Sequence, residues 1–160
     1  NNLKIAQKLY QDVLKINSNH AVANYNLGLV FEKFQEFNKA KTFYKKAIES
    51  KPDYLDAHNN LGIIFRELGD LKNAKICFQK VLAIDSNYVI AIFNLGITFR
   101  ELGEFKEAIV CYKKVIKIRP NFVKAHNNIG NVYKKIGKDD KAIDHFQKAL
   151  KLNPKQLKLR

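Results

Sequence analysis

The side chains that most often carry out chemistry in proteins are sparse in this sequence. Its cysteines and histidines lack the spacing of a metal site, and two cysteines cannot build a disulfide framework. Neither a glycine-rich phosphate loop nor a nucleophile motif is present. We therefore expect no catalytic site, no metal and no cofactor, so the chain by itself is not expected to be an enzyme. We also expect free thiols in a reducing, cytoplasmic compartment. The residues concerned are Cys77, Cys111, His20, His58, His126 and His145.

Asparagine amides offer a different chemistry, which is recognition through hydrogen bonds. Asparagine costs about 0.6 kcal/mol relative to alanine inside a helix, so its regular placement in helices needs a reason. Its amide has two donor hydrogens and a carbonyl acceptor, which can pair with the N–H and C=O groups of a peptide backbone. We expect such an asparagine ladder to bind a peptide. The alternatives are that the amides cap neighbouring groups or reflect an asparagine-rich composition. The ladder residues recur every 34 residues: Asn26, Asn60, Asn94 and Asn128.

The same 34-residue interval runs through the sequence and predicts the elements that position the ladder. Apolar and small residues spaced three, four and seven apart predict two helices in each repeat. Glycine falls between the two helices, where a helix ends with a left-handed residue, and Gln35 replaces it in the first repeat. An asparagine or aspartate precedes each first helix and is predicted to be its N-cap. The glycines are Gly69, Gly103 and Gly137, and the predicted caps are Asn19, Asp53, Asn87 and Asn121.

No repeat can bury both of its faces alone, so neighbouring repeats must stack into a curved, all-α solenoid. Glycines and alanines let the two helices of a repeat approach closely, and aromatic residues fill the space between them. We expect residues 1–160 to form one array. Residues 1–20 are the second helix of a partial repeat; four full repeats occupy 21–54, 55–88, 89–122 and 123–156; and 157–160 are a truncated tail. Both ends look cut, because the helix over 2–16 lacks a first-helix partner and Leu157 and Leu159 are left exposed.

Other first-helix residues are expected beside the ladder, facing the concave groove. Tyr25 and Phe93 precede ladder asparagines in alternate repeats, and Ile63 and Ile97 follow ladder asparagines. These apolar groups either anchor side chains of a partner or pack against a neighbouring helix. Two arginines followed by glutamate either contact the ligand or form ion pairs across repeats. These arginines are Arg66 and Arg100, and Lys124 and Asn131 complete the candidate set.

The pattern resembles the tetratricopeptide repeat (TPR) family over essentially the whole chain, because the period and six register positions agree in four copies. The resemblance implies a right-handed superhelical solenoid of antiparallel helix pairs that serves as a protein-interaction scaffold. The segments AHNNLG (57–62) and AHNNIG (125–130) resemble repeats of O-linked N-acetylglucosamine transferases, where such a ladder holds the substrate's peptide backbone. The catalytic domain of those enzymes is absent from this sequence. Lys124 matches one position of the carboxylate clamp of chaperone-tail members, but Asn128 stands where that clamp has arginine, which argues against that specificity.

Composition adds a strong positive charge, with 29 Lys and Arg against 15 Asp and Glu in 160 residues. Such a charge is compatible with acidic partners, nucleic acid or anionic membranes. However, the lysines of the second helices are scattered and lack an aromatic platform for stacking bases. No apolar run approaches the length of about 20 residues that a membrane span needs. Nucleic acid and membranes are therefore not expected as partners.

We expect a protein–protein interaction scaffold that binds an extended peptide segment in the groove. One alternative is a self-assembly module that forms a homo-oligomer through its ends. The other is the substrate-targeting region of a larger enzyme, such as a glycosyltransferase.

Overall fold

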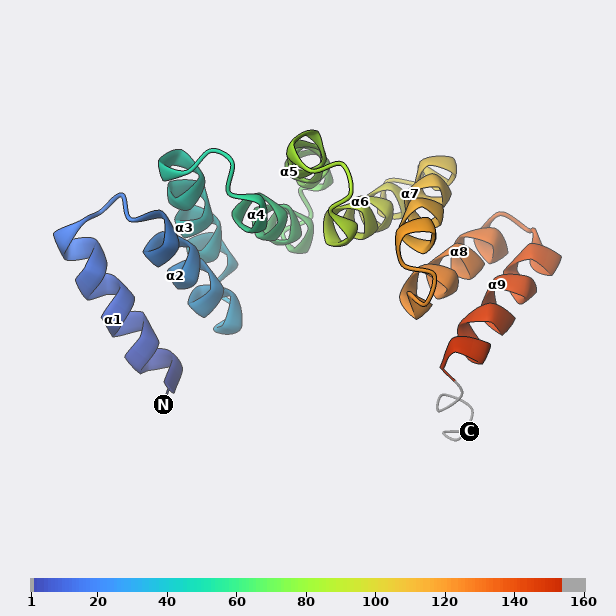
Figure 1. Cartoon of the computed structure of the whole chain (residues 1–160), viewed down its shortest axis with the longest axis horizontal. Coiled ribbons are helices and arrows are strands. Elements are labelled where there is room, and N and C mark those ends of the chain that lie inside the picture. Colours follow the sequence, from blue (N-terminus) through green and yellow to red (C-terminus); the bar gives the residue numbers. More distant parts are fainter. Residues whose placement is uncertain (1, 154–160) are drawn as a thin grey trace. The chain divides into compact units, whose positions relative to one another are not determined.

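The computed structural model describes residues 2–153, and in this range the chain folds into nine α-helices and no strand (Figure 1). The predictions about the tail 157–160, including Leu157 and Leu159, lie outside the described residues. The helices are α1 (Asn2–Ile16), α2 (Ala21–Lys33), α3 (Phe37–Ser50), α4 (Leu55–Glu67), α5 (Leu71–Ile84), α6 (Val89–Glu101), α7 (Phe105–Ile118), α8 (Val123–Lys135) and α9 (Asp139–Leu152).

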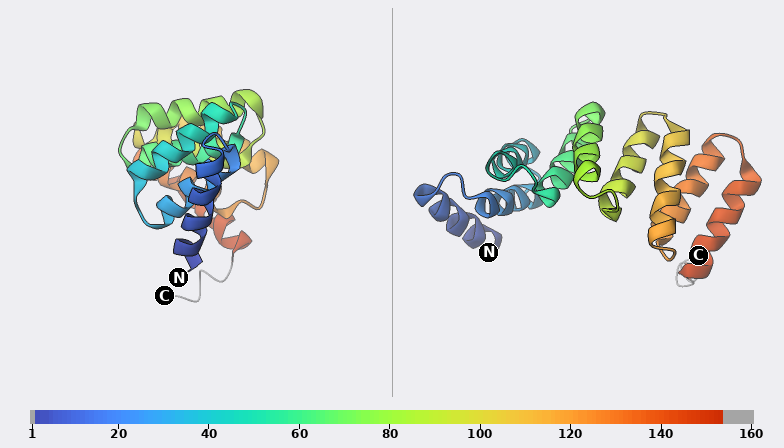
Figure 2. Two further views of the ribbon diagram at one scale, coloured as in Figure 1. Left: turned by 90° about the vertical axis from the view of Figure 1, so that its left-hand side faces the viewer. Right: turned by 45° about the horizontal axis from the view of Figure 1, so that its top comes forward.

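The chain divides into two compact units, Asn1–Ser86 and Asn87–Arg160. In the first unit each helix from α1 to α5 packs against the next helix in the sequence. In the second unit α6 to α9 follow the same rule, and α6 also contacts α8. Within each unit, short connections turn the chain back after each helix, so successive helices of one unit run antiparallel (Figure 2). The predicted pairing of helices is therefore seen in both units.

Each first helix carries a glycine against which an aromatic ring of the second helix lies. A Cβ atom added at Gly62 would stand 2.7 Å from Cε1 of Phe78, and one added at Gly96 would stand 2.7 Å from Cε1 of Tyr112. Both rings are fully buried. Any larger residue would displace these rings, which confirms that the glycines are needed for close helix packing.

The turn inside each helix pair ends the first helix with a left-handed residue, as predicted. Gly69 has φ +78°, and its amide donates to the carbonyl of Arg66 at 2.9 Å. The next amide, that of Asp70, donates to the carbonyl of Phe65 at 2.8 Å, which completes a Schellman motif. Gln35 takes the same conformation with φ +59°, although it has a side chain.

The predicted N-caps of the first helices are wrong by one residue. The N-cap of α4 is Tyr54, which makes no side-chain cap hydrogen bond, and the amide of Tyr54 donates to the carbonyl of Lys51 at 3.1 Å. Asp53 therefore lies in a four-residue turn behind Pro52, a sequence that favours such turns. The observed caps are His20, Tyr54, Tyr88 and Phe122, of which only His20 caps with its side chain.

A polar residue at the fourth position of a first helix fastens the preceding turn. Nε2 of His58 lies 2.8 Å from the carbonyl oxygen of Pro52. The side-chain nitrogen Nδ2 of Asn24 donates to the backbone carbonyl of Ser18 at 3.0 Å. His58 is 5% exposed, and its role is structural, as the sequence suggested.

Helix α1 buries none of its residues. Leu3, Ile5 and Leu9 have 41%, 58% and 61% of their surface exposed. The lysines of the second helices are also exposed, which places their charge on the solvent side. These lysines are Lys45, Lys46, Lys80, Lys113, Lys114 and Lys148.

Candidate functional site

The ladder asparagines occupy the sixth position of each first helix, but they differ in exposure. Asn94 is buried, with 7% of its surface exposed. The other three, Asn26, Asn60 and Asn128, are half-buried. The half-buried amides therefore present polar groups at the surface of α2, α4 and α8.

Asn60 is held in place by neighbouring side chains in the first unit. Its Nδ2 atom donates to the hydroxyl oxygen of Tyr25 on α2 at 3.2 Å. Its Oδ1 atom accepts from Nδ2 of Asn59 at 3.2 Å. An asparagine amide has two N–H groups and two carbonyl lone pairs. Asn60 also donates a side-chain hydrogen bond to the hydroxyl of Tyr44, so these three bonds leave one carbonyl lone pair of Asn60.

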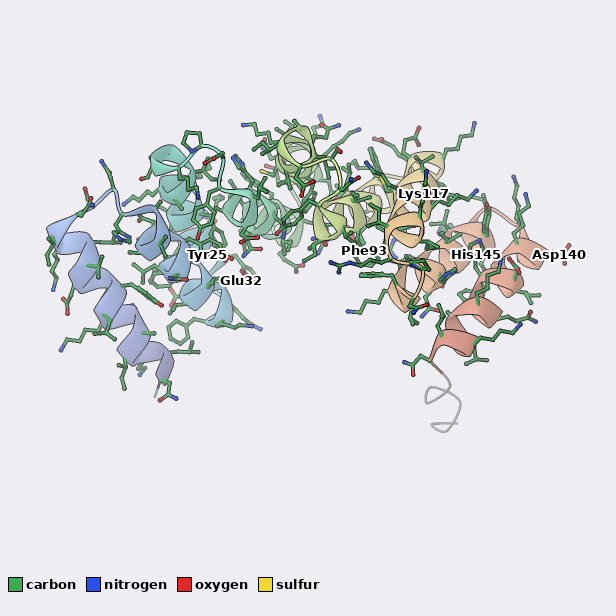
Figure 3. The ribbon with its side chains drawn as sticks, viewed as in Figure 1. Tyr25, Glu32, Phe93, Lys117, Asp140 and His145 are labelled. Atoms are coloured by element: carbon green, nitrogen blue, oxygen red, sulfur yellow. The ribbon has the colours of Figure 1, made fainter. Side chains whose placement is uncertain are left out.

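The ring of Tyr25 is packed between two other tyrosines. Its centroid lies 5.7 Å from that of Tyr44 and 4.9 Å from that of Tyr54. Burial, and next the charge of Asp56, raise the pKa of Tyr25 to about 12, so its hydroxyl stays protonated at neutral pH. Tyr25 and Glu32, both labelled in Figure 3, lie on α2 about two helical turns apart. The carboxylate of Glu32 accepts a hydrogen bond from the hydroxyl of Tyr44 at 2.6 Å.

Phe93 repeats this arrangement in the second unit. Its ring centroid lies 5.7 Å from that of Tyr112 and 5.1 Å from that of Phe122. The two predicted aromatic residues thus pack against a second-helix tyrosine and an aromatic N-cap residue. Of the two uses that the sequence left open, helix packing accounts for both rings, while the hydroxyl of Tyr25 also reaches the ladder.

Asn128 has a partner from the preceding first helix. Nη1 of Arg100 donates to Oδ1 of Asn128 at 3.5 Å, and Nη2 of Arg100 lies 3.8 Å from a carboxylate oxygen of Glu101. Arg66 forms the equivalent pair with Glu67 at 3.7 Å. The expectation that these arginines pair with glutamates across repeats is wrong for Arg100. Its described ion pair is with Glu101, the next residue in the sequence, and its hydrogen bond to the following repeat is made with Asn128.

A cavity of about 550 Å³ lies between α6, α7 and α8 of the second unit. It brings together two predicted residues, Arg100 and Asn131, with Lys135, which the sequence analysis did not single out. Lys135 follows Lys134 at the end of α8, and no 34-residue pattern of charge distinguishes it. The cavity offers two cations, an amide and an apolar wall, and its lining residues are Arg100, Glu101, Gly103, Phe105, Asn131, Val132 and Lys135.

The remaining predicted residues differ in exposure. Ile63 and Ile97 are half-buried. Lys124 is exposed at the start of α8. None of these three lines the cavity beside Arg100.

Within residues 2–153, no three His, Cys, Asp or Glu side chains gather in a way that could hold a metal ion. None of the described helices is long and apolar enough to cross a membrane. Both cysteines are free thiols.

Comparison with solved structures finds the same helical architecture. A crystal structure of MamA is 29% identical, with a TM-score of 0.88, and the match covers 95% of this chain and 89% of that one. A crystal structure of YrrB, described as a TPR protein with an unusual peptide-binding site, is 26% identical with a TM-score of 0.84, covering 96% and 79%. MamA from Desulfovibrio magneticus RS-1 is 19% identical, with a TM-score of 0.82 over 96% of both chains, and shows likeness of fold alone. No curated protein sequence matched the chain.

Family profiles identify the repeats directly. Profiles described as tetratricopeptide repeat match residues 21–54, 55–88 and 123–156. A further profile described as TPR repeat matches residues 97–137. Together these matches cover well over half of the chain, and they agree with the all-α solenoid fold predicted from the sequence. The chain belongs to the tetratricopeptide repeat family.

Proposed function

We propose that this chain is a protein-interaction scaffold that binds an extended peptide along its first helices through the asparagine ladder. The observation that carries the proposal is the geometry of Asn60, whose amide is oriented by Tyr25, Tyr44 and Asn59 and keeps a carbonyl lone pair for a ligand. A peptide backbone supplies the complementary N–H group at every residue except proline. The ladder would therefore bind the main chain with little regard to the side chains of the peptide.

The spacing of the repeats fits this mode of binding. Packed helices lie about 8–10 Å apart, and an extended chain advances about 3.3 Å per residue. One ladder asparagine would therefore serve about three residues of the peptide. The resemblance of residues 57–62 and 125–130 to the repeats of O-linked N-acetylglucosamine transferases supports the same arrangement.

The cavity beside Arg100 adds a preference for acidic side chains. Arg100, Lys135 and Asn131 offer charged and neutral donors, while Phe105 and Val132 supply apolar surface. A glutamate or aspartate of the peptide would pair with the two cations, although Glu101 already offsets part of the charge of Arg100. The peptide-binding site of YrrB supports the proposal only in the sense that a similar fold has such a site.

The experiment starts from a peptide of about six residues, which matches the two ladder asparagines of one unit at one asparagine per three residues, selected from a random phage-display library. Its dissociation constant is measured by fluorescence anisotropy for the wild type and for the double variant Asn60→Ala and Asn128→Ala. We expect the double variant to lose about 1–3 kcal/mol of binding free energy, because backbone groups of the peptide lose their partners.

The matched control changes two exposed amides on second helices, Asn38→Ala and Gln147→Ala. It should leave the affinity unchanged. Cross-linking of the peptide to α4 or α8 in the wild type verifies that it lies on the first helices. If the Asn60 and Asn128 variant then binds this peptide with full affinity, the ladder does not bind the peptide backbone and the proposal fails.

A second candidate function is self-association, favoured by the exposed apolar side chains of α1. Exposed apolar surface of this kind is a common interaction site. We propose the homo-oligomer as an additional state of the same scaffold, and we keep the targeting region of a larger enzyme as the remaining alternative. The free thiols of Cys77 and Cys111 support the proposal that the protein works in a reducing compartment, such as the cytoplasm.

A further inference from the structure

Two histidines face each other between the last two described helices, away from the ladder. Nδ1 of His126 on α8 lies 3.3 Å from Nδ1 of His145 on α9, and the ring centroids are 5.5 Å apart. His126 is 7% exposed, and His145, labelled on α9 in Figure 3, is half-buried. The proposed peptide site makes no use of this pair.

The hydrogen bonds of the pair determine which nitrogen atoms carry protons. His126 also makes a hydrogen bond to the backbone of Pro120, which has only a carbonyl oxygen to offer. Because Nδ1 faces His145, the bond to Pro120 must come from Nε2–H, as it does in His58. Neutral His126 therefore has a bare Nδ1 lone pair, and the shared proton resides on Nδ1 of His145.

Both rings are neutral at neutral pH. Burial is the main cause that lowers the pKa of His126 and of His145. The hydrogen bond to Pro120 opposes this effect and raises the pKa of His126, whereas the charge of Lys148 lowers it further; for His145 the next cause that lowers the pKa is His126 itself. Neutral imidazole is the form in which histidine binds metal ions.

We propose that His126 and His145 form a two-ligand site for a divalent transition metal ion, with Zn²⁺ as the ion that fits best. Two nitrogen ligands at 2.0–2.1 Å from a tetrahedral zinc ion stand about 3.3–3.4 Å apart, and the two Nδ1 atoms stand 3.3 Å apart. The bond from His126 to the carbonyl of Pro120 is the kind of outer contact that orients metal-binding histidines.

Binding requires a change of tautomer and a small turn of both rings, because the two Nδ1 atoms face each other along their hydrogen bond. The proton on Nδ1 of His145 moves through solvent to Nε2 of the same ring, and both Nδ1 lone pairs then point to the ion. No net proton is released. Water molecules complete the coordination, because Asp144 is already paired with Lys148 at 2.6 Å and the described residues hold no larger cluster of ligands.

The first repeat of the chain supplies matched variants for the test. The residue equivalent to His126 is Asn24, at the fourth position of α2, and its side-chain amide bonds to the preceding turn as His126 does. The residue equivalent to His145 is Phe43, at the seventh position of α3. Phe43 stacks on Phe31 with centroids 5.3 Å apart, whereas His145 lies 5.7 Å from Tyr133 at the equivalent positions. The variants His126→Asn and His145→Phe therefore remove a ligand and keep a packing arrangement that the chain already uses.

The experiment titrates the ¹⁵N-labelled chain with zinc chloride and records two-bond ¹H–¹⁵N spectra of the histidine rings. We expect the signals of His126 and His145 to change together and the proton of His145 to appear on Nε2. Each variant should bind zinc at least ~10-fold more weakly, since one of two protein ligands is lost. Zinc should raise the melting temperature of the wild type and not that of the variants.

Circular dichroism verifies that each variant folds, and either variant alone suffices for the test. The proposal is overturned if zinc changes the rings of His20 or His58 as strongly as those of the pair. It is also overturned if a folded variant binds zinc like the wild type, or if millimolar zinc leaves His126 and His145 unchanged. These results do not depend on whether the ladder binds a peptide.

Discussion

At the residue scale, the candidate polar groups are held by neighbours before any ligand binds. Tyr25 and Asn59 orient the amide of Asn60, and Arg100 contacts the carbonyl oxygen of Asn128. A group that is already ordered loses less entropy when a ligand arrives. Mutation of Tyr25 to Phe would therefore remove an orienting bond while its ring kept the contacts with Tyr44 and Tyr54.

The two thiols, one buried and one half-buried, provide a prediction about reactivity. Burial raises the pKa of Cys77 and of Cys111 to about 11. At pH 8 only about one thiol in a thousand would then be a thiolate, the form that reacts with iodoacetamide. We expect slow alkylation of both residues at pH 8, a rise of about tenfold per pH unit up to the pKa, and fast alkylation in urea. Mass spectrometry of quenched samples measures these rates, and rapid modification of the folded chain at pH 8 would contradict this view of the thiols.

The ladder positions were predictable at this scale, and their surroundings were not. A strict 34-residue recurrence places Asn26, Asn60, Asn94 and Asn128 at equivalent sites. The partners of Tyr25 and Phe93 include Tyr54 and Phe122, which lie in turns 29 residues later in the sequence. Periodicity identifies the helix face of a residue, but contacts between a helix and a distant turn depend on three-dimensional packing.

At the element scale, helix-breaking residues and N-caps behaved differently. The glycines at 69, 103 and 137 are left-handed as predicted, because few other residues adopt that conformation without strain. The predicted N-caps of the first helices lie one residue too early. At Pro52-Asp53 and Pro120-Asn121 the predicted cap residue lies in a turn, and the next residue is the N-cap. Aromatic packing at Tyr54 and Phe122 replaces the side-chain hydrogen bond that the capping preference assumes.

Gln35 is a point where the local sequence conflicts with the fold. It holds φ +59° without the freedom of glycine, and a left-handed residue with a side chain costs about 1–2 kcal/mol. Glycine has an opposing effect, because it increases the conformational entropy of the unfolded chain and thereby lowers stability by about 0.4–1 kcal/mol. We expect Gln35→Gly to raise the free energy of unfolding by about 0.5–1 kcal/mol in urea titrations followed by circular dichroism.

The reverse substitution at the equivalent position, Gly69→Gln, is the matched control. Gly69 has φ +78° and no atom within 4 Å of an added Cβ, so only backbone strain changes. This variant should be destabilised. An unchanged or lower stability of Gln35→Gly, together with a tolerant Gly69, would show that the left-handed turn carries no strain.

At the scale of the whole molecule, the exposed side of α1 predicts self-association. Ile5 and Leu9 have more than half of their surface exposed, and no residue of α1 is buried. Exposed apolar side chains of this kind favour association with another copy of the chain. We expect light scattering to show a mass that rises with concentration, and we expect Ile5→Lys with Leu9→Lys to suppress that rise. A constant monomer mass for the wild type over a wide concentration range would exclude the homo-oligomer.

Each unit of the molecule also carries its own part of the ladder, so binding can be followed separately in both. Asn60 belongs to the first unit and Asn128 to the second. The division of the chain into repeats of 34 residues remains a prediction from the sequence. An affinity loss in both single variants would indicate that one peptide, or two copies of it, engages both units.

The most direct test of the central claim is the side-chain amide spectrum of the asparagines. The Nδ2 signals of Asn60, Asn128 and Asn38 are assigned through their alanine variants, and the selected peptide is added to the ¹⁵N-labelled chain. If the ladder binds the peptide backbone, the signals of Asn60 and Asn128 shift in proportion to the bound fraction while that of the exposed Asn38 stays in place. If the peptide binds fully and both ladder signals remain where they were, the ladder is not the binding site.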